Sequence, residues 1–184
     1  MAGQDRLDLT HAQLLVVDLQ QKLIPHVRDH ADVIAQSVRM IRAAVELDIP
    51  ITLTEQYRKG LGPTDPAVVE ACGDAPRLEK LAFSVCGDEA ARERVVSLMR
   101  PSVILVGIET HICVEQTALD LLAMQMRPFI AADAVGSRRR LDHEVGLSRL
   151  QSVGAVVTTV ESAIFSLLGK AGTDLFRRVL PLVR

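Results

Sequence analysis

Three side chains that lie far apart in the sequence have the types that nucleophilic chemistry needs: Cys113, Asp18 and Lys80. Cys113 follows the apolar run 102–107 and opens a stretch of helical periodicity. A thiol at a helix N-terminus faces unpaired N–H groups and the positive end of the helix dipole, which lowers its pKa and favours the thiolate. We therefore expect Cys113 to be a nucleophile if a base and a charged partner reach it.

Asp18 and Lys80 are the candidates for that base and that partner. Asp18 ends the apolar run 14–18, and Lys80 lies in the mostly apolar stretch 78–84. In an open parallel sheet, ligands bind beyond the carboxyl ends of the strands, where these side chains would meet. Taken singly, each residue also has an ordinary structural reading, because free cysteines are mostly buried filler, aspartates cap loops and lysines lie at the surface.

The rest of the chain alternates between short apolar runs and longer segments of helical period. Continuous apolar runs are typical of strands that are covered on both faces of a parallel sheet. This alternation predicts right-handed crossovers and an α/β fold, a three-layer α/β/α sandwich, over one domain spanning residues 1–184. The expected strands are 14–18, 50–54, 102–107, 128–132 and 155–160, and the expected helices are 32–46, 88–99, 113–126, 142–152 and 162–168.

Residues 55–87 contain glycines and prolines that we expect to break any regular element. A long irregular connection in a compact domain usually forms a lid or a pocket wall. We expect substrate contacts from Gln20, Gln56 and Tyr57, which follow the first two strands. Whether His111 or the run Arg138–Arg139–Arg140 also contacts substrate stays open at this point.

Composition excludes several classes of protein. The chain has 184 residues, 48% hydrophobic, with a net charge of −2 from 21 basic and 23 acidic residues, which excludes intrinsic disorder. The chain has no excess of basic residues that would attract nucleic acid, and aromatic residues, which could stack on bases, make up only 3%. Without an apolar run of about 18 residues or a signal-peptide pattern, we expect no membrane contact and a cytoplasmic location. A mean hydropathy of +0.22 favours a homo-oligomer, either a dimer, a tetramer or a larger assembly.

Several sequence stretches together resemble the isochorismatase-like cysteine hydrolases, and most closely the uncharacterised isochorismatase-domain branch. The resemblance covers nearly the whole chain in the same order of elements. The stretches are LLVVDLQ (14–20), LTEQYRKGLGPT (53–64), LEKLAFSVCGD (78–88), VILVGIETHICVEQTALDLL (103–122), AADAVGSR (131–138) and GAVVTTVES (154–162).

This resemblance implies a role for each candidate residue. The family's acidic residue falls on Asp18, its lysine on Lys80 and its nucleophile on Cys113. Its non-proline cis peptide falls between Ile108 and Glu109, where the N–H of Glu109 would join that of Cys113 in an oxyanion hole. The resemblance also implies a six-stranded, mostly parallel sheet with a short strand near Lys80, and dimers or larger rings.

Two departures from the family narrow the implied activity. The nicotinamidase branch binds a metal through histidines after the second strand, whereas Glu55-Gln56-Tyr57 has none. True isochorismatases lack the nucleophilic cysteine, which is present here as Cys113. The resemblance therefore implies hydrolysis of an amide or carbamoyl C–N bond in an unidentified small molecule through a thioester, without a metal or other cofactor.

Two readings from other classes remain open. A strand-ending Asp18 suits aspartyl-phosphate enzymes, although their second acid, two residues later, is replaced by Gln20. The chain could also be a non-catalytic scaffold or binding subunit, a reading that intact Asp18, Lys80 and Cys113 make less favourable.

Overall fold

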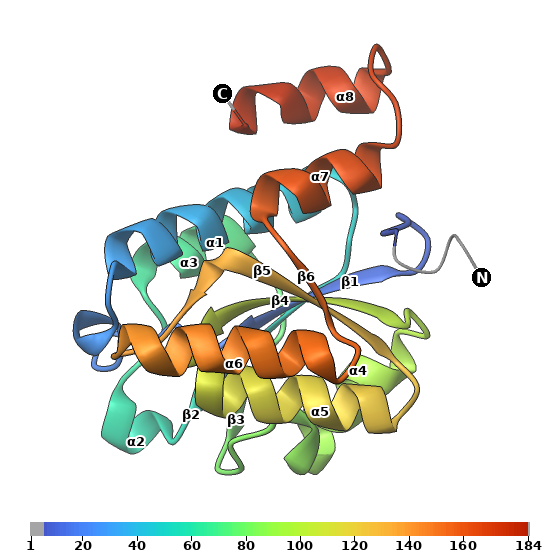
Figure 1. The fold of residues 1–184 in the computed structure, drawn as a ribbon. Coiled ribbons are helices and arrows are strands. Elements are labelled where there is room, and N and C mark those ends of the chain that lie inside the picture. Colours follow the sequence, from blue (N-terminus) through green and yellow to red (C-terminus); the bar gives the residue numbers. More distant parts are fainter. Residues whose placement is uncertain (1–5, 184) are drawn as a thin grey trace.

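A six-stranded sheet forms the centre of the computed structural model, which describes residues 6–183 (Figure 1). The sheet order is β3-β2-β1-β4-β5-β6, and every pair of neighbouring strands is parallel. The predicted six-stranded sheet is therefore confirmed, and its named strands are all parallel. The strands are β1 (Ala12–Val17), β2 (Ile51–Gln56), β3 (Arg77–Lys80), β4 (Ser102–Ile108), β5 (Arg127–Gly136) and β6 (Val156–Thr158).

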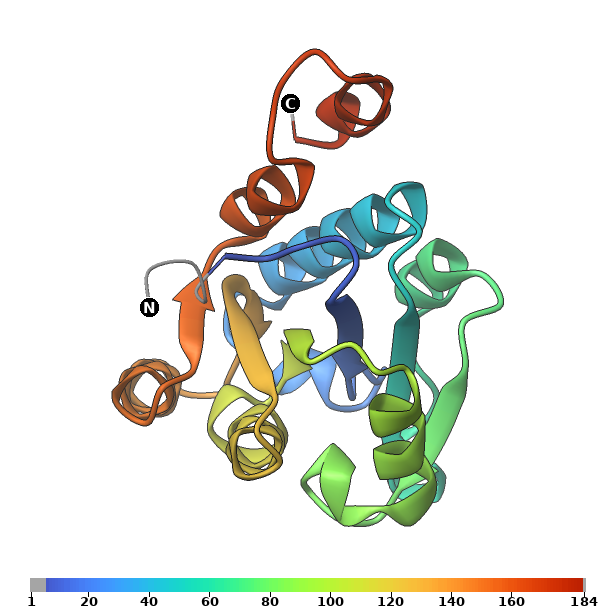
Figure 2. The same cartoon turned by 90° about the vertical axis from the view of Figure 1, so that its right-hand side faces the viewer.

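Helices cover both faces of the sheet and confirm the three-layer α/β/α sandwich (Figures 1 and 2). One layer contains α1 (His30–Glu46), α3 (Pro66–Cys72) and α7 (Val160–Leu168), with α8 (Asp174–Val179) stacked outside α7. The opposite layer contains α4 (Glu89–Ser97), α5 (Glu115–Ala123) and α6 (Arg140–Ser152). The short helix α2 (Arg58–Leu61) follows β2, and short 3-10 turns span Ile24–His26, Val85–Gly87 and Leu180–Leu182.

The central strands explain why their sequences are apolar without interruption. Every residue of β1 and β4 is buried. Successive side chains of a strand point to opposite faces, so these strands supply two cores at once. In β1, Leu14 and Val16 pack in the core beneath α1, whereas Leu15 and Val17 pack in the core beneath α5.

The strand order reverses between β1 and β4, which are neighbours although two strands separate them in sequence. Such a switch point opens a crevice at the carboxyl ends of the strands. Gly107 lies there with φ +121°, and a side chain on it would collide with the carbonyl oxygen of Val17. Only glycine allows the close approach of these two strand ends.

The prediction that residues 55–87 lack regular structure was wrong in part. This segment contains α2 and α3, which were not expected, and β3, the short strand near Lys80 that the resemblance implied. The start of α3 has a clear local signal, because Asp65 caps the helix by accepting from the Ala67 N–H and Pro66 occupies the first turn. We missed that signal because the surrounding glycines and prolines were read only as helix breakers.

Two other boundaries differ from prediction for local reasons. The last strand ends at Thr158, because Thr159 caps α7 by accepting from the Ser162 N–H. The helix expected from Cys113 begins instead at Glu115, after a π-helical turn over Thr110–Val114. Within residues 6–183, no helix has the length and apolar character needed to span a membrane.

Candidate active site

Asp18 lies directly after β1 in a left-handed backbone conformation, with φ 51°. Its carboxylate is fully buried. One oxygen, Oδ1, accepts a hydrogen bond from Thr54 Oγ1 at 2.8 Å, and the other, Oδ2, accepts from Lys80 Nζ at 2.7 Å. Thr54 lies on β2 beside the end of β1, so both oxygens are oriented by the neighbouring strands.

Lys80 is the last residue of β3, and its ammonium is completely buried. Besides Asp18, it donates to Gln56 Oε1 at 2.8 Å and to the carbonyl oxygens of Phe83 and Ala82 at 2.9 and 3.2 Å. A buried charge is tolerated only when it is paired and hydrogen-bonded in this way. Lys80 therefore acts as a fixed positive charge against Asp18.

Cys113 lies in the π-helical turn after β4 and is 6% exposed. Burial and, after it, charge repulsion from the nearby Asp18 carboxylate raise the pKa of its thiol to about 12. Lys80 and the backbone N–H of Glu109 act in the opposite direction. The expectation that this position lowers the pKa of Cys113 was therefore wrong, because desolvation outweighs the helix terminus.

The three residues singled out from the sequence thus meet at the carboxyl ends of β1, β3 and β4. In the resting site, Cys113 is a thiol whose pKa the nearby Asp18 carboxylate raises, and Lys80 holds that carboxylate by a hydrogen bond of 2.7 Å. This arrangement can move the thiol proton directly to Asp18 when a substrate arrives. Within residues 6–183, no group of three or more His, Cys, Asp or Glu side chains could hold a metal ion.

The peptide bond between Ile108 and Glu109 is cis. The carbonyl oxygen of Glu109 accepts from the N–H groups of Ile112 and Val114 at 3.1 and 3.2 Å, on either side of Cys113. The carbonyl of Cys113 is itself held by Thr117 Oγ1 at 2.6 Å. The turn that carries the sulfur is therefore fixed by its own backbone.

His111 and the three arginines at 138–140 all have partners within the chain. His111 Nδ1 is 2.9 Å from Ser137 Oγ. Arg138 pairs with Glu109, Arg139 with Asp142 and Arg140 with Glu144. The contacts of His111 and Arg138 join the cysteine turn to the segment that follows β5, whereas the pairs of Arg139 and Arg140 are local to α6.

The three residues expected to bind substrate have different surroundings. Gln20 is fully buried and bonds through both ends of its amide to the backbone of Gln56 and Gly62. The Gln56 side chain accepts from Lys80 and donates to the Leu81 carbonyl. Tyr57, in contrast, is 49% exposed. Substrate binding by these residues stays a prediction, and the first two also shape the site from within.

Sequence reasoning missed the groups that orient the charged pair. Thr54 was included in an expected strand, but its bond to Asp18 was not foreseen. The carbonyls of Ala82 and Phe83 carry no sequence signal, because every residue has a carbonyl group. The position of Thr54 at the end of the expected strand 50–54 was the one available indication.

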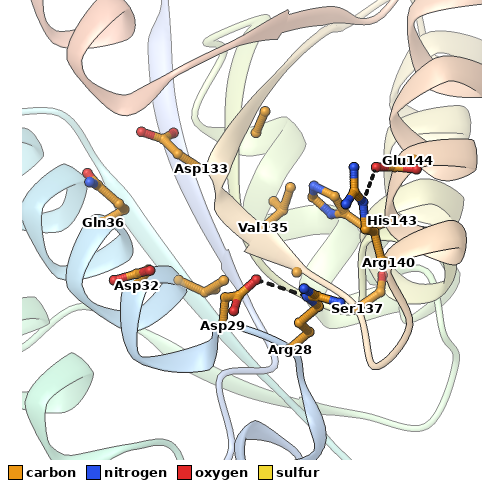
Figure 3. Close-up of a pocket in the computed structure, with 13 residues that line it drawn as sticks. Arg28, Asp29, Asp32, Gln36, Asp133, Val135, Ser137, Arg140, His143 and Glu144 are labelled. Carbon is orange, nitrogen blue, oxygen red and sulfur yellow. Dashed lines mark hydrogen bonds and ion pairs between the residues drawn. The ribbon is translucent and has the colours of Figure 1, made fainter.

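A cavity of about 510 Å³ lies at the carboxyl end of β5, between the N-terminal parts of α1 and α6 (Figure 3). Asp18, Lys80 and Cys113 are not among the residues that line it. Figure 3 shows Asp32 and Asp133 on one side and His143 and Arg140 on the other. The cavity is therefore separate from the three converging residues, although Ser137 and His143 in its wall contact the cysteine turn.

Comparison with known proteins agrees with this fold. The family model described as "Isochorismatase domain" matches residues 12–162. The chain therefore belongs to the isochorismatase family, as the sequence motifs predicted. Its fold is that of a family whose members generally hydrolyse amide or ester-type bonds.

Individual relatives extend over nearly the whole chain. Isochorismatase domain-containing protein 2 of Danio rerio is 38% identical over 100% of this chain and 92% of its own length. The solved structure of MAR1 ribonuclease from Caenorhabditis elegans is 36% identical, with a TM-score of 0.92 over 97% of this chain and 92% of that chain. The YcaC gene product of Escherichia coli, described as an octameric hydrolase of unknown specificity, shares the fold at 23% identity, with a TM-score of 0.87 over 97% and 87% of the two chains.

Proposed function

We propose that this protein is a cysteine hydrolase that cleaves an amide or carbamoyl C–N bond of a small molecule through a thioester intermediate. Cys113 is the nucleophile, Asp18 is the general base and acid, and Lys80 stabilises the charge on Asp18. The observation that carries the proposal is the fully buried ion pair of Asp18 and Lys80, which lies near enough to Cys113 for both charges to act on the pKa of its thiol. The chain acts as one isochorismatase-like domain, and a cytoplasmic location remains its predicted setting.

The first half of the reaction forms the thioester. The Cys113 thiol proton passes to Asp18 as the sulfur attacks the carbonyl carbon, and the carbonyl π electrons move to its oxygen. The backbone N–H groups of Glu109 and Cys113 stabilise that oxyanion. The oxyanion then collapses, the C–N bond breaks, and Asp18 returns the proton to the departing nitrogen.

The second half restores the enzyme with the same groups. A water molecule gives a proton to Asp18 and adds its oxygen to the thioester carbon. When the C–S bond breaks, the sulfur leaves with its electron pair and takes the proton back from Asp18, so the free thiol is regenerated. The products are an amine or ammonia and a carboxylic or carbamic acid.

A panel of small primary amides, carbamates and ureas tests this proposal by ammonia release. We expect at least one compound to be turned over, and Cys113→Ala to lower that rate by about a thousandfold or more. Cys72→Ala is the matched control, because Cys72 is also buried but lies in the other core. Full turnover by Cys113→Ala, or no turnover of any compound by the wild type, would contradict the proposal.

A ribonuclease activity is the second candidate, because the C. elegans relative named as MAR1 ribonuclease is 36% identical. The C–N hydrolase is preferred, since a net charge of −2 gives no general attraction for a polyanion. Incubation with labelled single-stranded RNA separates the two. RNA cleavage that is lost in Cys113→Ala, without any amide turnover, would favour the ribonuclease.

A non-catalytic or phosphotransfer-type domain is the remaining alternative. The Asp18 carboxylate already accepts hydrogen bonds on both oxygens and lies fully buried, which leaves little access for a phosphoryl group. Beryllofluoride, a phosphoryl analogue, tests this reading: binding that is lost in Asp18→Asn would support it.

A further inference from the structure

Three consecutive residues that lead into Cys113 are each tied by a side chain to the segment that follows β5. Glu109 pairs with Arg138, Thr110 Oγ1 is 2.9 Å from His143 Nδ1, and His111 Nδ1 is 2.9 Å from Ser137 Oγ. Gly146 of α6 packs against the same turn, since a side chain there would meet the Cα of His111 at 3.3 Å. The cysteine turn is therefore clamped along one side by the β5–α6 connection and the start of α6.

Glu109 is the central residue of this clamp. Its carbonyl oxygen accepts from the N–H groups on either side of Cys113. Its own N–H, as a hydrogen-bond donor, lowers the pKa of the Cys113 thiol. Its side chain is only 7% exposed, so the carboxylate needs a partner. The carboxylate and the N–H belong to the same residue, so the partner of the carboxylate helps to fix where Glu109 lies beside Cys113.

Both the backbone and the side chain of Arg138 bind the Glu109 carboxylate. Its backbone N–H donates to Glu109 Oε2 at 2.9 Å, and its guanidinium Nε lies 3.2 Å from Oε2 and 3.1 Å from Oε1. The main chain and the side chain of one residue thus hold both carboxylate oxygens. Bonds from two directions fix the carboxylate more rigidly than one flexible ion pair would.

We propose that Arg138 is a positioning residue, which holds the Glu109 carboxylate so that the Glu109 N–H stays directed at the sulfur of Cys113. The inference deepens the proposed function, because the same N–H would stabilise the oxyanion. Arg138 does not touch the reacting atoms; it acts through Glu109.

The neighbouring Arg139 provides a matched control. It has the same side chain, is 72% exposed against 58% for Arg138, and pairs only loosely with Asp142 at 3.8 Å. Replacing Arg139 changes the net charge equally without disturbing Glu109. A difference between the two variants therefore reports the contact and not the charge.

The test measures alkylation of each cysteine by iodoacetamide at pH 8.5, with mass spectrometry of the separated peptides. It needs no substrate, so it remains informative even if the wild type releases no ammonia from any amide. We expect Arg138→Ala to alkylate Cys113 about threefold more slowly than the wild type, because losing the directed N–H raises the pKa of the thiol and so disfavours the thiolate. Arg139→Ala should match the wild type, and Arg138→Lys should lie between.

Cys72 and Cys86 serve as internal controls, since both are buried and neither contacts Arg138 or Glu109 through a hydrogen bond or an ion pair; Cys72 lies in the other core. If their alkylation rises in Arg138→Ala, the fold itself has loosened, and Arg138→Lys then decides the question. The inference is overturned if Cys113 is alkylated in the Arg138 variant as fast as in Arg139→Ala, or faster. That variant is Arg138→Ala when its fold is intact and Arg138→Lys when it is not. Where an amide substrate is found, Arg138→Ala should lower kcat while leaving KM nearly unchanged.

Discussion

At the scale of single residues, the site depends on a lysine that is wholly inside the protein. The Lys80 ammonium has four acceptors, of which Asp18 is the only charged one. Burying the pair costs desolvation energy that a pair of hydrophobic residues would not cost. Such a pair is therefore weak evidence for stability and better explained by the chemistry that we propose.

Removing one member of this pair should be severe. Lys80→Met leaves the Asp18 carboxylate buried without its counter-charge, and we expect a loss of about 3–5 kcal/mol in the free energy of unfolding. Urea titration followed by circular dichroism measures it. Lys59→Met is the control, since Lys59 is exposed. A loss as small as that of the control would show that Asp18 does not need Lys80.

Asp18→Asn should separate thiol reactivity from catalysis. The Asp18 carboxylate raises the pKa of the Cys113 thiol, so its neutral replacement lowers that pKa and increases the thiolate fraction at any given pH. We expect faster alkylation of Cys113 by iodoacetamide at pH 8 together with loss of amide turnover, because the base is gone. Slower alkylation in this variant would contradict the arrangement of charges described above.

At the scale of elements, the site depends on how closely β1 and β4 approach at their carboxyl ends. The backbone at Gly107 has φ +121°, and a side chain there would collide with the Val17 carbonyl. The next residue after Val17 is Asp18, so any displacement of β1 moves the base. The close contact between β1 and β4 therefore also sets the position of Asp18, the proposed base.

Gly107→Ala tests that contact. It adds a collision to the cost of the left-handed backbone, which by itself is about 1–3 kcal/mol. Gly154→Ala is the control, because Gly154 has φ +103° with nothing within 4 Å of the added carbon. We expect Gly107→Ala to lower the melting temperature clearly more than Gly154→Ala, as measured by calorimetry. Equal decreases in melting temperature would mean that β1 can move away from the added carbon without loss of stability.

At the scale of the whole molecule, burial of all three cysteines links stability to pH. Burial raises the pKa of Cys72 and Cys113 to about 12 and that of Cys86 to about 11, from an ordinary 9.0. The unfolded chain therefore loses these thiol protons at a lower pH than the folded protein does. Their contribution to stability is complete below pH 9 and declines as the pH rises above it.

The free energy of unfolding should accordingly fall between pH 9 and 11, as measured by urea titration at a series of pH values. In Cys72→Ala the fall should be shallower, because one of the three thiols no longer contributes. Cys72 lies outside the proposed site, so this variant keeps the active-site charges unchanged. If the free energy of unfolding falls equally with pH in the wild type and in Cys72→Ala, burial does not raise the pKa of Cys72.

Self-association remains a prediction at the same scale. Several large apolar side chains are exposed on the single chain, among them Met99 at 86%, Leu81 at 72% and Leu141 at 59%. Light scattering should therefore give a mass that is a multiple of 20.1 kDa, and a monomer mass would contradict the expectation.

The sequence by itself determined the fold class, the main strands and helices, and the residue types of the site. It could do so because apolar periodicity follows secondary structure directly, and because strand ends locate side chains such as Asp18 at one edge of a parallel sheet. Short elements such as α3 and α8 escaped prediction, since a few capped turns show little periodicity. The signals available were their caps, Asp65 and Thr173, and Pro66 in the first turn of α3.

Only the tertiary structure decided the protonation state of Cys113 and the partners that orient it. The helix-terminus argument used local sequence and gave the wrong sign, because the pKa depends on burial and on Asp18, which lies 95 positions away in the chain. The clamp from Arg138 to Glu109 is likewise a contact between separate strand ends. Desolvation and charge pairing are set by distances in space, and the order of residues along the chain does not contain those distances.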